Sequence, residues 1–189
     1  MKIIFGGAFN PPTIAHKEIY NYIKSNIKFD SFVYLPVSNR YHKDNLLKNE
    51  DRYNMLKIMM KDYKDVTISK DEFKDKKYLG TYHYLKGQKE ECFFLIGSDN
   101  LRDLKTWINY EKLVSECHFI VISRDNMDDE SYIKTDTLLY KNKDNFVLLK
   151  GFNMDVSSSE FRRTNDKSLV TKEVYEYIIK HKLYGGSYE

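Results

Sequence analysis

Short apolar runs alternate along the chain with segments whose apolar residues recur at helical spacing. In the segment Ile14–Ile27, Ile19, Ile23 and Ile27 are each four residues apart, which predicts an amphipathic helix. Further helices are predicted over Thr81–Lys86, around Tyr53, Leu56 and Met60 with Asn49 as a cap, and around Val174, Tyr175, Ile178 and Ile179 with Thr171 as a cap. Strands are predicted at Lys2–Phe5, Ser31–Val37, Asp65–Ser69, Cys92–Ile96, His118–Ile122 and Phe146–Leu149.

The strongest of these strands, Cys92–Ile96 (CFFLI) and His118–Ile122 (HFIVI), are continuous apolar runs without the alternation of a half-exposed sheet. Continuous apolar strands separated by helices indicate a parallel sheet covered on both faces. We therefore expect an α/β fold with a doubly wound parallel sheet, in which ligands bind where the strands end. Residues 124–145 are polar and poorly periodic, and we interpret them as a loop with a short helix, its Asp128-Asp129-Glu130 cluster exposed rather than metal-binding. Residues 1–189 read as a single domain.

Composition narrows the class of protein. The chain is 41% hydrophobic and 31% charged, which excludes a disordered chain. A net charge of +3 argues against a nucleic-acid surface, although basic residues can still cluster around phosphates. No apolar run approaches the roughly 20 residues of a membrane span, and the opening MKIIFGGAFNPP does not resemble a signal peptide. We expect a cytoplasmic protein with Cys92 and Cys117 unpaired; a homo-oligomer is compatible with the sequence.

The segment Gly6–His16 (GGAFNPPTIAH) follows the first strand and opens the first helix. Two of the eight glycines and two of the three prolines fall here. Glycines allow backbone amides to approach a ligand, and a helix that begins beyond them offers amides to phosphate. Thr13 and His16 share one face of the first turn. The spacing is neither that of a Walker loop nor that of a dinucleotide fingerprint, and it alone is equally compatible with a tight turn.

A second candidate phosphate site lies at Val156–Arg163 (VSSSEFRR). Serines at the start of a helix cap it, and an arginine three or four residues later presents a guanidinium group that matches phosphate. A capped helix alone would need no arginine, and arginine is scarce in this chain. We therefore predict a polyphosphate cradle built from Ser157, Ser158, Ser159 and Arg162.

Together these two motifs resemble the signatures of the nucleotidylyltransferase superfamily, G-x-F-D-P-x-H/T-x-G-H and I-S-S-T-x-I-R. His16 matches the second histidine, Ser159 the threonine and Arg162 the arginine. The chain departs at Asn10, Ala15 and Thr13, where aspartate, glycine and histidine are usual. Threonine in place of that histidine, as at Thr13, is normal in the pantetheine-phosphate adenylyltransferase branch. The resemblance implies a Rossmann-like nucleotidylyltransferase domain.

Other segments resemble the bacterial nicotinate-nucleotide adenylyltransferases across nearly the whole chain. Gly97-Ser98-Asp99 with Trp107 is similar to that family's G-x-D…W segment, and Leu35-Pro36 with His42-Lys43 to its P-H-K segment. Gly80-Thr81-Tyr82-His83 is similar to its S-Y-T segment, with His83 at the second hydroxyl position. The C-terminal Tyr177-Ile178 and His181–Tyr184 match its final helix. Helix packing for Trp107 and a solvated loop for Lys43 are the plainer interpretations.

The resemblance implies transfer of AMP from ATP to nicotinate mononucleotide, with Mg²⁺ held by ATP phosphates rather than by protein ligands. It implies catalytic roles for His16, Thr13 and Arg162. The ATP-binding residues implied are Gly6, Gly7, Ala8, Phe9, His16, Gly97, Asp99, Ser123, Arg124, Ser157, Ser158, Ser159 and Arg162. The residues implied for nicotinate mononucleotide are Lys43, Thr81, Tyr82 and Trp107, with Trp107 stacked on the pyridine ring.

Three alternatives stay open at this point. In the first alternative the acceptor is phosphopantetheine, which Thr13 favours and Trp107 disfavours. In the second it is nicotinamide mononucleotide, which the sequence does not distinguish from nicotinate mononucleotide. In a third alternative, suggested by Asn10 and Ala15, the chain is a nucleotide-binding module without catalysis. The retained His16, Ser157–Ser159 and Arg162 argue against that reading, because a module that only binds has no need of a pyrophosphate cradle.

Overall fold

A computed structural model describes residues 1–40, 46–74, 78–123 and 127–185 of the chain. Its six strands form one parallel sheet in the order β3-β2-β1-β4-β5-β6. The strands are β1 (Lys2–Gly7), β2 (Ser31–Pro36), β3 (Val66–Ile68), β4 (Cys92–Gly97), β5 (His118–Ile122) and β6 (Phe146–Leu149). The predicted doubly wound α/β fold is confirmed, and the strand order reverses between β1 and β4, where such sheets bind ligands.

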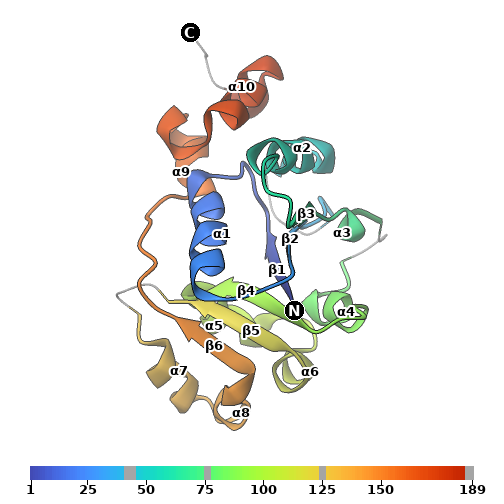
Figure 1. The fold of residues 1–189 in the computed structure, drawn as a ribbon, viewed down its shortest axis with the longest axis vertical. Helices are drawn as coiled ribbons and strands as arrows, with labels where there is room; N and C mark the ends of the chain where they lie inside the picture. Colours follow the sequence, from blue (N-terminus) through green and yellow to red (C-terminus); the bar gives the residue numbers. More distant parts are fainter. Residues whose placement is uncertain (41–45, 75–77, 124–126, 186–189) are drawn as a thin grey trace.

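Helices cover both faces of this sheet (Figure 1). They are α1 (Ile14–Asn26), α2 (Asn49–Met59), α3 (Asp71–Lys74), α4 (Thr81–Lys86), α5 (Ser98–Asp103), α6 (Tyr110–Glu116), α7 (Asp129–Thr135), α8 (Thr137–Lys141), α9 (Ser158–Thr164) and α10 (Lys172–Lys180). Among the described residues, no helix is long and apolar enough to cross a membrane.

The strands β1, β2, β4, β5 and β6 each contribute to two hydrophobic cores, because successive side chains point to opposite faces. Ile3 packs with residues of α1, α2 and α10, whereas the adjacent Ile4 packs with residues of α4 to α8. Both side chains are fully buried. This explains the continuous apolar runs of the central strands β4 and β5.

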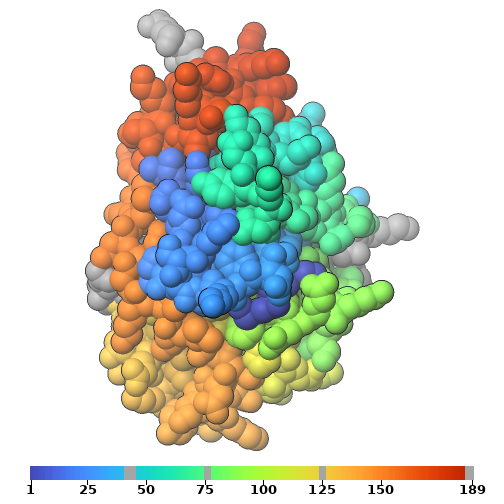
Figure 2. Space-filling view, viewed as in Figure 1, coloured from blue at the N-terminus to red at the C-terminus, as the bar shows by residue number. Residues whose placement is uncertain are grey.

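The C-terminal part of the chain packs on the first of these faces. Thr171 caps α10 as predicted, because its hydroxyl accepts a hydrogen bond from the Val174 amide at 3.4 Å. In the space-filling view the C-terminal residues, drawn in red, lie against the blue N-terminal region and the green α2 (Figure 2). Residues far apart in the sequence therefore meet above the end of β1.

The prediction for Asn49 as a helix cap was wrong. The helix begins at Asn49 itself, after Lys48. The Asn49 side-chain oxygen instead accepts from the Asn39 amide at 2.8 Å and from Arg52 at 2.8 Å. It thereby ties the helix to the segment that follows β2.

The interpretation of residues 124–145 as a loop with one short helix was also wrong. The described part contains α7 and α8, and each buries a single apolar side chain, Ile133 and Leu139 respectively. With one apolar anchor per helix there is no periodicity to detect. Nor is Asp129 exposed: its side chain is fully buried against Arg102 and Ser98.

Candidate active site

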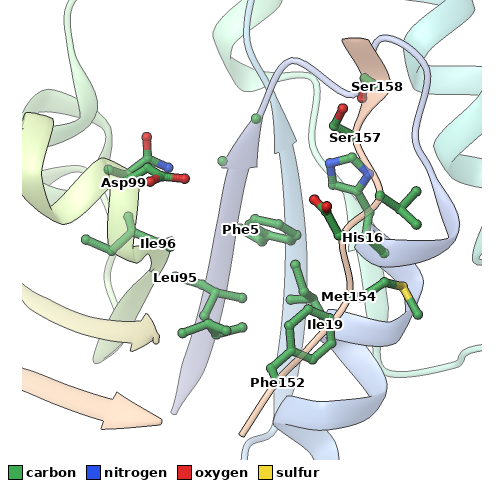
Figure 3. A pocket seen from close by; sticks show the side chains of 18 of the residues that line it. Phe5, His16, Ile19, Leu95, Ile96, Asp99, Phe152, Met154, Ser157 and Ser158 are labelled. Atoms are coloured by element: carbon green, nitrogen blue, oxygen red, sulfur yellow. The ribbon is translucent and has the colours of Figure 1, made fainter. Parts of the chain in front are cut away.

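A cavity of about 700 Å³ opens at the carboxyl ends of β1 and β4 (Figure 3). His16, Ser157 and Ser158 lie on one side of it, and Asp99 lies across from them in this view. Its lining residues are Phe5, Gly6, Gly7, Ala15, His16, Ile19, Leu95, Ile96, Gly97, Asp99, Asn100, Ile122, Phe152, Asn153, Met154, Asp155, Val156, Ser157 and Ser158. The predicted residues Gly6, Gly7, His16, Gly97, Asp99, Ser157 and Ser158 are therefore brought together.

The His16 ring is oriented by Thr13. The Thr13 backbone N–H donates to His16 Nδ1 at 2.9 Å, and the Thr13 hydroxyl lies 2.9 Å from the same nitrogen. Burial lowers the pKa of His16 to about 4, so the ring is neutral at pH 7. Because Nδ1 accepts a backbone hydrogen bond, the single ring proton resides on Nε2. The site thus holds a neutral hydrogen-bond donor whose tautomer is set by the loop.

The two predicted phosphate motifs are in direct contact. The Ser158 hydroxyl donates to the Pro11 carbonyl at 2.7 Å, across 147 positions of the sequence. Arg162 donates from Nη1 to the Asn10 carbonyl at 2.6 Å and from Nη2 to the Ser159 hydroxyl at 3.0 Å. Arg162 and Ser159 do not line the cavity; they hold the loop at its edge.

Ser157 has a different role from Ser158. Its hydroxyl accepts a hydrogen bond from the Glu160 amide at 3.1 Å, which caps α9 as predicted. An acceptor hydroxyl retains its own proton, whereas the Ser158 proton is engaged by the Pro11 carbonyl. Ser157 is therefore the serine that lines the cavity with a proton available for donation.

Arg52 supports the loop from beneath, and the sequence analysis missed it. Its fully buried guanidinium group donates to the carbonyls of Ala8, Val37 and Leu47 at 2.6–3.0 Å, and to the side chains of Asn39 and Asn49. Burial lowers its pKa to about 10, which leaves it charged at neutral pH. The scarcity of arginine was the only signal in the sequence, and it does not reveal burial.

Close packing at Gly6 brings the end of β1 onto β4. A Cβ atom at Gly6 would lie 2.6 Å from Phe94 Cζ, whereas a Cβ atom at Gly97 would have nothing within 4 Å. Phe9 turns away from the cavity into the first core, with a positive φ of 48°. The backbone carbonyl of Ala8 accepts a hydrogen bond from Arg52. The side chains of Ala8 and Phe9 therefore do not line the cavity.

Beside Asp99, a buried ionic network joins α5 to α7. Asp129 accepts hydrogen bonds from the Ser98 hydroxyl at 2.7 Å and from Arg102 Nη1. Arg102 also donates to the Ser98 carbonyl at 3.0 Å. Because Ser98 immediately precedes Asp99, this network fixes the first turn of α5 and with it the backbone that carries Asp99.

The described residues that were predicted to bind the acceptor are not among those that line the cavity. Trp107 is half-buried, with its ring edge-on to Phe94 at 6.1 Å between centroids. Gly80, which precedes Thr81, has a φ of +90°, and a Cβ atom at Gly80 would lie 2.9 Å from Ile108 Cβ. Thr81 is buried, and the Tyr82 hydroxyl donates to Glu116 at 2.9 Å. Lys43 lies outside the described residues.

Ser123 follows β5, and its amide donates to the Leu149 carbonyl at 2.8 Å. Its hydroxyl is buried and has no hydrogen-bond partner within the part of the chain that the structure describes. Arg124, predicted beside it, lies outside the described residues.

One whole wall of the cavity was not predicted. Residues Phe152–Val156 extend from β6 toward Ser157, and the ring of Phe152 packs against Tyr22 of α1 at 5.4 Å. The Tyr22 hydroxyl also donates to the Lys150 carbonyl. This wall is irregular backbone without periodicity, so only the adjacent serine motif could have pointed to it.

The cavity carries carboxylates, Asp99 and Asp155, but these do not form a metal centre by themselves. Over residues 1–40, 46–74, 78–123 and 127–185, no group of three or more histidine, cysteine, aspartate or glutamate side chains is placed to hold a metal ion.

Comparison with known proteins places this geometry in a family. The model of the cytidylyltransferase-like family matches residues 4–164. A probable nicotinate-nucleotide adenylyltransferase of Fusobacterium nucleatum is 35% identical over 95% of this chain and 98% of its own length. Another from Acholeplasma laidlawii is 33% identical over 97% of both chains. The chain therefore belongs to the cytidylyltransferase-like family of nucleotidyltransferases.

Solved structures agree with this placement. Plasmodium falciparum nicotinic acid mononucleotide adenylyltransferase complexed with APC has a TM-score of 0.80 and 26% identity, over 97% of this chain and 96% of that one. The same enzyme complexed with NaAD has a TM-score of 0.79 and 27% identity over 97% of both chains. Within the family, the chain belongs with the nicotinate-nucleotide adenylyltransferases.

Proposed function

We propose that this protein transfers the AMP part of ATP to nicotinate mononucleotide, forming nicotinate adenine dinucleotide and pyrophosphate. The observation that carries the proposal is the contact between the two phosphate motifs, which places His16, Ser157 and Ser158 on one cavity. The relatives named for this reaction, and the neighbour complexed with NaAD, support the choice of acceptor. We place the reaction in the cytoplasm, where ATP is abundant.

In the reaction, a phosphate oxygen of nicotinate mononucleotide attacks the α-phosphorus of ATP in line. A bond forms between that oxygen and the α-phosphorus, and the bond from the α-phosphorus to the bridging oxygen of the β-phosphate breaks. The phosphate oxygen is already ionised near neutral pH, so the protein need not supply a base. Its work is to align the reactants and to stabilise the charge that develops.

His16 would donate a hydrogen bond from its Nε2–H group to an oxygen of the α-phosphate. The lowered pKa of His16 keeps the ring neutral at pH 7, and a neutral imidazole acts through its one N–H group as a hydrogen-bond donor. Thr13 acts through this ring, because it holds Nδ1. The leaving pyrophosphate would meet the Ser157 hydroxyl. Arg162, bonded to the loop at the edge of the cavity, would contribute its positive charge.

Gly97 and Asp99 are proposed to bind the adenosine ribose, because a carboxylate just beyond a strand end can accept hydrogen bonds from ribose hydroxyls. The backbone near Ser123 is proposed to read adenine. Mg²⁺ is proposed to accompany ATP, where it would neutralise phosphate charge.

The test of the proposed function is release of pyrophosphate from ATP in the presence of one acceptor at a time. Nicotinate mononucleotide should support release, and phosphopantetheine should not. Faster release with nicotinamide mononucleotide would change the acceptor. An absence of release with every acceptor would leave a nucleotide-binding module without catalysis.

His16→Ala should lower kcat by about 100-fold, because an oriented donor to the transition state is lost. The matched control is His118→Ala, since His118 is exposed at the opposite end of the sheet, stacked on Phe93. Unchanged turnover in His16→Ala would remove His16 from the mechanism.

Trp107→Ala tests the acceptor site separately. Loss of a stacking face for the pyridine ring should raise KM for nicotinate mononucleotide while leaving KM for ATP nearly unchanged. The two constants are measured by varying one substrate at saturation of the other. An equal rise in both would contradict the stacking assignment.

A further inference from the structure

Tyr184 brings the C-terminal region onto the loop that follows β1. Its hydroxyl donates to Asn10 Oδ1 at 3.0 Å, across 174 positions of the sequence. Its ring packs edge-on against Phe161 of α9, with 5.8 Å between centroids. Phe161 is fully buried, so the tyrosine rests on a fixed surface. The reaction described above assigns Tyr184 no role.

Asn10 is the point at which four segments meet. Besides the Tyr184 hydroxyl, its side-chain oxygen accepts from the Leu47 amide at 3.2 Å. Its backbone carbonyl accepts from Arg162 at 2.6 Å. The residue is 2% exposed, so these hydrogen bonds form with little competition from water. The position of the loop therefore depends on donors from the C-terminal region as well as on its own sequence.

The backbone at Tyr184 is in an uncommon conformation. Its φ of 63° lies in the left-handed region, as does the φ of 51° at Lys182. Bulky side chains seldom adopt this region, and the conformation persists only where surrounding contacts impose it. The conformation at Tyr184 is the one that brings its ring to Phe161 and its hydroxyl to Asn10.

We propose that Tyr184 is a positioning residue for adenylyl transfer, a role that rests on the proposed function. Its hydroxyl holds Asn10, and Asn10 anchors the loop whose other end is Thr13. Since the Thr13 amide fixes the His16 ring, a small displacement of the loop redirects the Nε2 donor. Misplacement of a catalytic donor by even 1 Å is costly to the rate.

The test compares Tyr184→Phe with Tyr177→Phe. Both variants lose one hydroxyl in the C-terminal region, but Tyr177 bonds Asp51 at 3.0 Å and Asn54 at 3.3 Å on α2, not the loop. Tyr184→Phe should lower kcat/KM for ATP about fivefold, the effect of losing one hydrogen bond. Tyr177→Phe should leave kcat/KM unchanged. An equal fall in both variants would show a general structural role and overturn the proposal.

Amide hydrogen exchange gives a readout that does not need activity. The peptide spanning residues 6–16 should exchange faster in Tyr184→Phe than in the unmodified protein, and Tyr177→Phe should not change it. Unchanged exchange in Tyr184→Phe would overturn the positioning role. If the unmodified protein released no pyrophosphate, the proposed reaction would be wrong, yet faster exchange would still confirm that Tyr184 positions the loop.

Discussion

The His16 ring presents the same proton to the cavity at every pH where it stays neutral. Its Nδ1 is an acceptor for the Thr13 amide, so a second proton on that nitrogen would replace a hydrogen bond with a repulsive contact. Burial also disfavours the charged ring, because it removes that charge from water, and it lowers the pKa of His16 to about 4. The environment therefore selects both the charge and the tautomer.

This selection predicts a pH dependence of stability. A histidine has a pKa of about 6.5 when unfolded, so between pH 6.5 and about 4 the unfolded chain binds more protons than the folded one. The stabilising contribution of His16 is therefore complete above pH 6.5 and is lost as the pH falls through this window. Urea unfolding at pH 7 and pH 5 measures it.

The matched variant is His16→Asn, which keeps an acceptor near the Thr13 amide but does not titrate. Its free energy of unfolding should fall less between pH 7 and pH 5 than that of the unmodified protein. An identical fall in both proteins would mean that other groups account for the pH dependence.

Arg52 shows why some supporting residues escape sequence analysis. Its position on α2 reads as one more charged residue on a polar helix, and nothing in the spacing marks it as buried. Its role depends on carbonyls from the loops after β1 and β2, which converge only in the folded chain. His16, by contrast, lies within a motif that is contiguous in sequence, so its place in the cavity could be predicted.

At the scale of elements, the ends of β1 and β4 differ in how tightly they are packed. Gly6→Ala should destabilise the protein by about 1–3 kcal/mol, because its Cβ atom would overlap the Phe94 ring. Gly97→Ala should change stability by less than about 0.5 kcal/mol, because the space beside it is open. Thermal unfolding of the two variants tests the difference. Equal losses would show that the contact between Gly6 and Phe94 is not limiting.

The strands could be predicted to within one or two residues because a strand buried on both faces must be apolar along its whole length. The helices α7 and α8 could not, since each is anchored by a single apolar side chain. The same segment hid Asp129, whose burial depends on Arg102 and Ser98 from another helix. A sequence pattern reflects contacts that recur along one element, whereas Asp129 is held by side chains from α5.

At the scale of the molecule, the cavity exists because four chain segments meet at the point where the strand order reverses. β1 and β4 supply its floor, α1 supplies His16, and residues 152–158 close one side. The general location could be predicted from the parallel sheet. The closing segment could not, because its path follows from packing on Tyr22 rather than from any regular structure.

A nucleotide that fills this cavity should stabilise the whole fold. At a concentration 100 times its Kd, ATP with Mg²⁺ should raise the free energy of unfolding by about 2.7 kcal/mol, because it binds only the folded chain. Urea unfolding with and without the nucleotide measures the increase. CTP at the same concentration should stabilise less, since the proposed site selects adenine; equal stabilisation would contradict that selection.

The hydrogen bonds that hold the loop around Asn10 can form only late in translation. Residues 6–16 emerge from the ribosome early, but their partners Ser158, Arg162 and Tyr184 are added much later. Domains fold as units once the necessary chain is available. A nascent chain that has completed β1 and α1 would therefore carry the loop between them without these partners, and only translation through Tyr184 would supply all three.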